Sequence, residues 1–112
     1  MTFEQLKNLA CKHFKVTKTQ FDGKGRTINV VYARIAVAKV LHKKGYTLHE
    51  IGDMLHLNHS TIFHHLNTFE DRIKYDIIFA NTYKIMYFCY LYRNKTLSPI
   101  LYSKKQNVLT SE

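Results

Sequence analysis

The sequence predicts an all-α protein: a compact multi-helix domain that contains a helix-turn-helix and carries an extra C-terminal helix. A threonine followed three residues later by Gln or Glu occurs as Thr2/Gln5, Thr17/Gln20 and Thr47/Glu50, and each pair is a capping box, which begins a helix. Apolar residues recur at intervals of three and four, the period of a helix, whereas strand signals are almost absent. A chain of 112 residues makes one domain with a core of its own.

The first 45 residues are expected to form three helices. The first starts at the Thr2 capping box, and its inward residues are predicted to be Phe3, Leu6, Leu9, Ala10 and Phe14. A short second helix starts at Thr17 and ends near Phe21, and a flexible basic loop follows at 22–26. The third helix spans about 27–44 and is stopped by Gly45. Its inward face is predicted to hold Ile28, Val31, Ile35, Ala38 and Leu41.

Residues 47–70 have the form of a helix-turn-helix. Leu48, Ile51, Met54 and Leu55 fall on one face of its first helix, and the close approach of another helix would explain Gly52. Leu57 and Asn58 are expected to form the turn, with Asn58 or His59 as the cap of the second helix. The inner stripe of that helix is predicted to be Ile62, Leu66 and Phe69. Its outward residues are predicted to be Asn58, His59, Ser60, Thr61, His64 and His65.

Small polar residues at a helix N-terminus can meet DNA phosphates and base edges together, which favours major-groove recognition of double-stranded DNA. The alternative is an ordinary helical hairpin in which the Asn-His-Ser-Thr cluster at 58–61 only caps a helix. The charge favours DNA. Residues 1–45 contain ten basic and two acidic residues, against seven and six in residues 46–112, and a one-sided basic half suggests a polyanionic partner.

The last helix is expected at about 77–93. Its most hydrophobic part, 77–92, is shorter than the roughly 20 residues of a membrane span and contains Asn81 and Lys84. This aromatic segment is expected to close the core or to form a dimer interface. The helical DNA-binding domain then covers 1–95, and 96–112, which includes Pro99, is expected to be a loosely ordered tail.

The remaining features argue against other classes of protein. Cys11 and Cys89 lack the spacing of a metal site and are expected in the core, and no signal peptide is visible, so a cytoplasmic, nucleoid-associated protein is expected. Five of the seven histidines lie between 49 and 65, without the cysteine or carboxylate spacing of a zinc site. They are interpreted as replacing lysines on a DNA-facing surface, His49 among them. No nucleophile with a base and no paired carboxylates are present, so no enzyme and no cofactor is predicted.

The order of these motifs resembles the C-terminal DNA-binding domain of the bacterial replication initiator DnaA. The resemblance covers about residues 3–75. The matching segments are Phe-Lys-Val-Thr at 14–17, the basic loop at 24–26, Ala-Arg-Ile-Ala at 33–36, Leu41, Thr-Leu-His-Glu-Ile-Gly at 47–52 and Asn-His-Ser-Thr-Ile at 58–62.

The resemblance implies a Trp repressor-like fold that binds DnaA boxes, which are short asymmetric duplex sites, as a monomer. It implies that Arg26, supported by Lys24, enters the minor groove and that Arg34 holds a phosphate; a surface salt bridge is the alternative for Arg34. His59, Ser60 and Thr61 match the family's contacts to bases and phosphates. Asn58 replaces an aspartate, which would move its preference from cytosine toward adenine.

The chain departs from the family pattern in three ways. The turn at 57–58 is one residue shorter than the family's Gly-Gly-Arg-Asp and lacks its arginine, and Arg34 sits one position off the usual register. No Gly-x-x-x-x-Gly-Lys-Ser/Thr loop is present, so no nucleotide is expected to bind. The alternative function is a protein-protein interaction or dimerisation module that uses the aromatic C-terminal helix, so a homodimer remains open.

Overall fold

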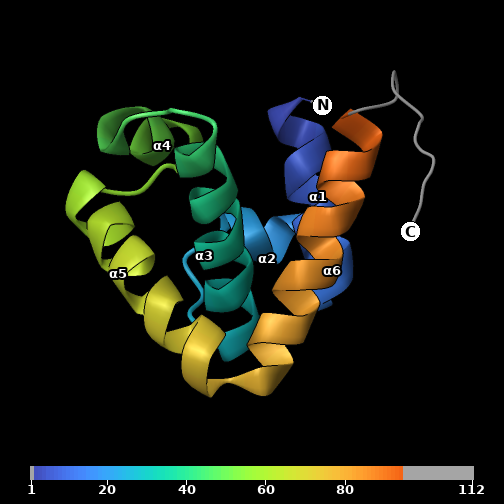
Figure 1. Ribbon diagram of the computed structural model, residues 1–112. Helices are drawn as coiled ribbons and strands as arrows, with labels where there is room; N and C mark the ends of the chain where they lie inside the picture. Colours follow the sequence, from blue (N-terminus) through green and yellow to red (C-terminus); the bar gives the residue numbers. More distant parts are fainter. Residues whose placement is uncertain (1, 95–112) are drawn as a thin grey trace.

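The computed structural model describes residues 2–94, and this part of the chain is helical throughout (Figure 1). The helices are α1 (Phe3–Phe14), α2 (Lys18–Asp22), α3 (Ile28–Lys43), α4 (Leu48–Leu55), α5 (His59–Tyr75) and α6 (Ile77–Asn94). The predicted all-α class is confirmed, and each expected helix occurs in its expected place, although α5 extends five residues beyond the predicted position 70. The tail expected at 96–112 lies outside the described residues.

The three predicted capping boxes are all present. At Thr2, Thr17 and Thr47 the hydroxyl oxygen accepts from the backbone N–H three residues on, and the Gln or Glu side chain there accepts from the backbone N–H of the threonine. Each box satisfies two amides that a helix start otherwise leaves without partners. At the other end of α3, Gly45 adopts a φ of +101°, which stops the helix as predicted.

The central helix α3 is buried on most of its circumference, because α1, α4, α5 and α6 all pack against it. A single inward face was therefore the wrong expectation for this helix: Ile28, at its exposed start, is 55% exposed, whereas Ala33, Ala36 and Val37 on other faces are fully buried. Short alanine side chains let neighbouring helices approach closely.

Helices α5 and α6 diverge from their junction at Asp76 like two arms, with α3 between them (Figure 1). One carboxylate oxygen of Asp76 accepts from the backbone N–H of Phe79, 3.0 Å away, and the other accepts from the hydroxyl of Tyr32 on α3. The Phe79 amide, followed by the Tyr32 hydroxyl, lowers the pKa of Asp76. The junction is thereby tied to the central helix.

The inner face of α6 closes the core. Of the two expectations for this segment, core closure and a dimer interface, the first is confirmed. Its buried residues are Phe79, Ala80, Tyr83, Met86 and Tyr90. The Phe79 ring lies 5.8 Å from those of Phe14 and Phe69, centroid to centroid. Among residues 2–94 no helix combines the length and hydropathy that crossing a bilayer requires.

Candidate nucleic-acid interface

The turn between α4 and α5 consists of His56, Leu57 and Asn58, one residue more than the expected Leu57–Asn58. His56 adopts the left-handed conformation with a φ of +57°, and the backbone N–H of Leu57 donates to the carbonyl of Gly52 at 2.8 Å. Asn58 is extended, and its side-chain oxygen accepts from the backbone N–H of Ser60 at 2.8 Å. Of the two predicted caps, Asn58 is therefore the one used.

Gly52 is required by this turn and not by a neighbouring helix, which corrects the expectation. A Cβ atom at position 52 would lie 2.5 Å from the carbonyl oxygen of Leu57, closer than real Cβ contacts. The chain can return toward α4 and enter α5 directly only because position 52 has no side chain.

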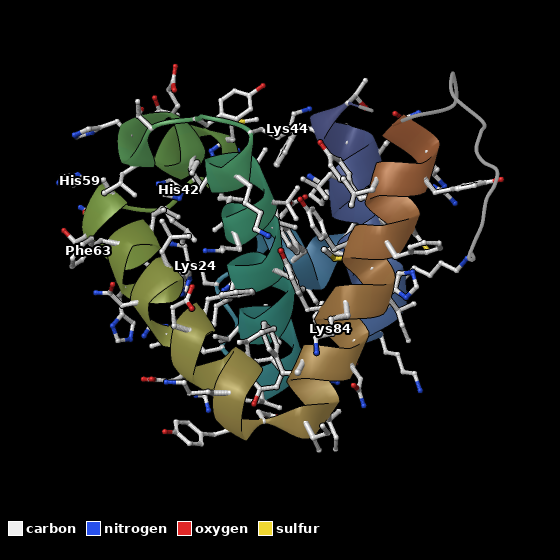
Figure 2. All side chains as sticks on the ribbon, viewed as in Figure 1. Lys24, His42, Lys44, His59, Phe63 and Lys84 are labelled. Atoms are coloured by element: carbon white, nitrogen blue, oxygen red, sulfur yellow. The ribbon has the colours of Figure 1, made fainter. Side chains whose placement is uncertain are left out.

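The start of α4, the turn and the first turns of α5 together present an outward surface, which we call the recognition face. Its residues are all exposed: His49, Asn58, His59, Ser60, Phe63 and His64. Figure 2 shows His59 and Phe63 on the side of α5 that is turned away from α3. The His49 ring of α4 lies 4.2 Å from that of His59, centroid to centroid. Thr61, which was predicted to face outward, is only half exposed. The structure thus brings most of the predicted residues of α4 and α5 onto one surface.

Phe63 is a member of this surface that the sequence interpretation missed. It is 56% exposed, although a large apolar residue is normally buried. The signal was present, because position 63 lies one helical turn after His59 and outside the stripe of Ile62 and Phe69. An apolar side chain in this position suits contact with a thymine methyl group.

Asn58 has less capacity for base contact than the sequence suggested. A bidentate contact to adenine needs both the amide oxygen and the amide nitrogen. The oxygen already accepts from Ser60, so the cap leaves only the NH₂ group to donate.

His65 is buried, which contradicts its predicted outward position. It is 8% exposed, and its Nδ1 atom has no hydrogen-bond partner in the described part of the chain. Burial, with smaller effects from the charges of His64 and Arg34, lowers the pKa of His65 to about 4. His65 therefore lies on the inward side of α5, near Arg34 of α3, and is unavailable to DNA.

The buried His65 predicts an acid-sensitive stability. Its pKa falls from an ordinary 6.5 to about 4 in the folded protein. The unfolded chain therefore binds a proton more readily between these values, and the stabilisation is complete above about pH 6.5 and is lost as the pH falls toward 4. Between pH 7 and pH 4.5, the free energy of unfolding of His65→Leu should fall by about 1–3 kcal/mol less than that of the original protein. Urea unfolding at the two pH values measures this difference.

The exposed neighbour His64 provides the control: its charge has only a smaller effect on the His65 pKa, so His64→Leu should retain most of the acid dependence of the original protein. His13, whose pKa is also lowered, chiefly by burial, contributes equally in all three proteins. An acid loss in His65→Leu equal to that of the original protein would contradict the assignment.

Arg34 holds the basic loop in place from inside the domain. The side chain is 7% exposed, and its guanidinium donates to four carbonyl oxygens of residues 20–25. The acceptors and distances are Gln20 at 3.2 Å, Phe21 at 3.1 Å, Gly23 at 2.7 Å and Gly25 at 3.0 Å. Burial, and then the charge of Arg26, lowers the Arg34 pKa.

This arrangement corrects the expectation for Arg34. A phosphate contact or a surface salt bridge requires an exposed guanidinium, and this one is enclosed by backbone. In contrast, Lys24 and Arg26 are exposed, and their side chains form no hydrogen bond or ion pair within residues 2–94. Arg34 of α3 lies near α5, since its charge contributes to the lowered pKa of His65. Lys24 and Arg26 are therefore available to a ligand, and Arg34, on α3, positions the loop that carries them.

Much of the excess positive charge of the N-terminal half is used within the protein. Six of its ten basic side chains make internal contacts: Lys7, Lys18, Arg34, Lys39, Lys43 and Lys44. Lys43 and Lys44 lie over the rings of Tyr87 and Tyr90 on α6, with 4.5 and 5.6 Å to the ring centroids. The net charge thus overstates the number of cations available to a polyanion. Across residues 2–94, no three His, Cys, Asp or Glu side chains converge as metal ligands would.

The chain matches a known protein family. A family model described as the bacterial DnaA protein helix-turn-helix matches residues 3–68, from the start of α1 into α5. The matched region contains the basic loop, Arg34 and the whole recognition face, and it leaves out the end of α5 and all of α6. No curated protein and no solved structure matches the chain.

Proposed function

Because the chain belongs to the bacterial DnaA helix-turn-helix family, a family of DNA-binding modules, we propose that it binds duplex DNA sequence-specifically, with α5 in the major groove and the basic loop in the adjacent minor groove. The target sites are short and related to DnaA boxes, and binding there acts in the control of replication or transcription. The module acts by binding alone and catalyses no reaction.

The observation that carries this proposal is the recognition face at the start of α5. Ser60 and His59 offer donors and acceptors beside the helix N-terminus, which favours phosphate, and Phe63 offers an apolar surface one turn further on. A helix that presents polar atoms and an apolar ring together can discriminate base pairs in the major groove.

The basic loop supplies the second contact. Lys24 and Arg26 flank Gly25, and Arg34 of α3 fixes the backbone of this loop. An arginine held in this way suits a narrow, A·T-rich minor groove, where the negative potential is enhanced. No Lys or Arg occurs between Gly45 and Asp71, so the recognition face has no such cation of its own, and the basic loop is proposed to supply one.

The experiment that tests the proposal is selection of bound duplexes from a random pool, followed by a titration at several salt concentrations. We expect one enriched sequence and an affinity that falls as salt rises, because bound cations release counterions from phosphates. Arg26→Ala should weaken binding to the selected site by about 1–3 kcal/mol and relax the preference at an A·T position.

Lys84→Ala is the matched control. Lys84 is exposed on α6, on the opposite side of α3 from His59 (Figure 2). The substitution therefore removes one positive charge at a position away from the proposed interface. Its affinity should stay close to that of the original protein. Equal losses in the two variants, or no retention of any duplex at low salt, would refute the proposed interface.

A further inference from the structure

The outer side of α6 carries an apolar stripe that the domain leaves uncovered. Ile78, Asn81, Ile85, Phe88 and Tyr92 are all exposed and follow the spacing of three and four residues that marks the seam of a coiled coil. The four apolar members are between 56% and 74% exposed. The opposite side of the helix, with Phe79 and Met86, is fully buried in the core. Thus α6 is apolar on both sides, but among residues 2–94 only one side has a partner.

The stripe is large enough to be an interface. With Ile77 beside it, its apolar side chains expose on the order of 600 Å², given that an aromatic side chain alone offers about 150–250 Å². Soluble monomers rarely expose more than this in one patch, and a standard protein interface buries about 800 Å² per partner. The flanking residues of α6 would supply the remaining buried area.

We propose that this stripe is a homodimer interface, in which the α6 helices of two copies lie parallel as a short coiled coil. The seam contains no charged residue, so two copies meet without burying a charge. Its one polar member, Asn81, favours a second copy over an unrelated apolar partner. In a parallel pair, Asn81 faces Asn81 of the second copy, and each amide provides both the donor and the acceptor that the other needs.

The position of α6 makes this pairing compatible with an accessible recognition face. The stripe lies on the far side of α6 from the core, whereas α4 and the start of α5 lie across α3 from α6 (Figure 1). The dimer therefore carries two outward recognition faces. The inference concerns association alone and stands independently of the proposed DNA binding.

Sedimentation equilibrium of the full chain without DNA tests the proposal, over about 1–100 µM, the range expected for an interface of this size. We expect a mass rising to twice the chain mass of 13.3 kDa. Ile85→Asp, which places a carboxylate in the middle of the seam, should weaken association at least about tenfold. Phe63→Asp is the matched control, because Phe63 is also 56% exposed but lies on α5, and it should dimerise as the original protein does.

Cross-linking tests the parallel register. In a Cys89→Ser background, Asn81→Cys should form a disulfide-linked dimer on mild oxidation, because the same seam position of two parallel helices brings the Cβ atoms within bonding reach. A 13.3 kDa species at the highest concentration, or dimerisation unchanged by Ile85→Asp while circular dichroism shows both proteins folded, would overturn the proposal. A dimer that does not cross-link through position 81 would overturn its parallel register.

Discussion

Arg34→Ala is expected to lower the free energy of unfolding by about 3–5 kcal/mol, the largest effect of any single side chain in the basic loop region. The substitution removes the donors of four carbonyl oxygens in residues 20–25 and leaves a cavity where the guanidinium was buried. Urea unfolding measures the loss. Limited digestion with trypsin measures the release of the loop, since cleavage after Lys24 and Arg26 should become faster.

Two further variants separate the role of the Arg34 side chain from its charge. Arg34→Lys keeps the charge but replaces a planar fork of donors by one ammonium group, so it should recover only part of the stability. Arg26→Ala removes an exposed arginine of the same loop and should change the stability by no more than about 0.5 kcal/mol. A loss below about 1 kcal/mol in Arg34→Ala would show that the loop does not depend on this residue.

Gly52→Ala is expected to destabilise the protein by about 2–3 kcal/mol and to abolish specific DNA binding. Alanine normally favours a helix over glycine by about 1 kcal/mol, but here its Cβ would lie 2.5 Å from the Leu57 carbonyl oxygen. Relief of this contact must move the backbone of the turn, and with it the start of α5. Thermal unfolding and the affinity for the selected duplex measure the two effects.

Gly25→Ala is the control for the glycine substitution itself. A Cβ atom at Gly25 would meet nothing within 4 Å, and the φ of this residue is not positive, so its stability should be unchanged or slightly higher. If Gly52→Ala were as stable as the original protein, the close approach of the turn to α4 would not be the reason for glycine at position 52.

The helices were predictable because their signals are local. A capping box such as Thr47/Glu50 lies within one helical turn, and its bonds form whatever the rest of the chain does. The six helices, the turn at Asn58 and the stop at Gly45 were therefore all accessible to sequence reasoning. The buried side of α6 was accessible as well, although its outer stripe left two interpretations open.

The errors concern residues whose environment comes from distant parts of the chain. His65 and Arg34 stand at helical spacing from buried apolar residues such as Ile62 and Val37, but their polarity argued for exposure. The carbonyl oxygens that accept from Arg34 belong to residues 20–25, which are distant from it in sequence. The family resemblance identified Arg34 as important but not its function as an internal support. The exposed fraction of Ile28 likewise follows from the packing of several helices around α3, which periodicity on one helix does not describe.

The internal use of lysine and arginine side chains has a consequence for how such a protein searches a genome. Attraction to arbitrary DNA grows with the number of cations that are free to meet phosphates, and here six of the ten N-terminal cations already contact carboxylates, carbonyls or aromatic rings of the protein. In the proposed complex, residence at incorrect sites would be correspondingly brief, because few counterions would be released there. The ratio between correct and incorrect sites would then depend on the shape and hydrogen bonds of a helix surface without Lys or Arg, and selectivity would come from low background occupancy more than from tight binding.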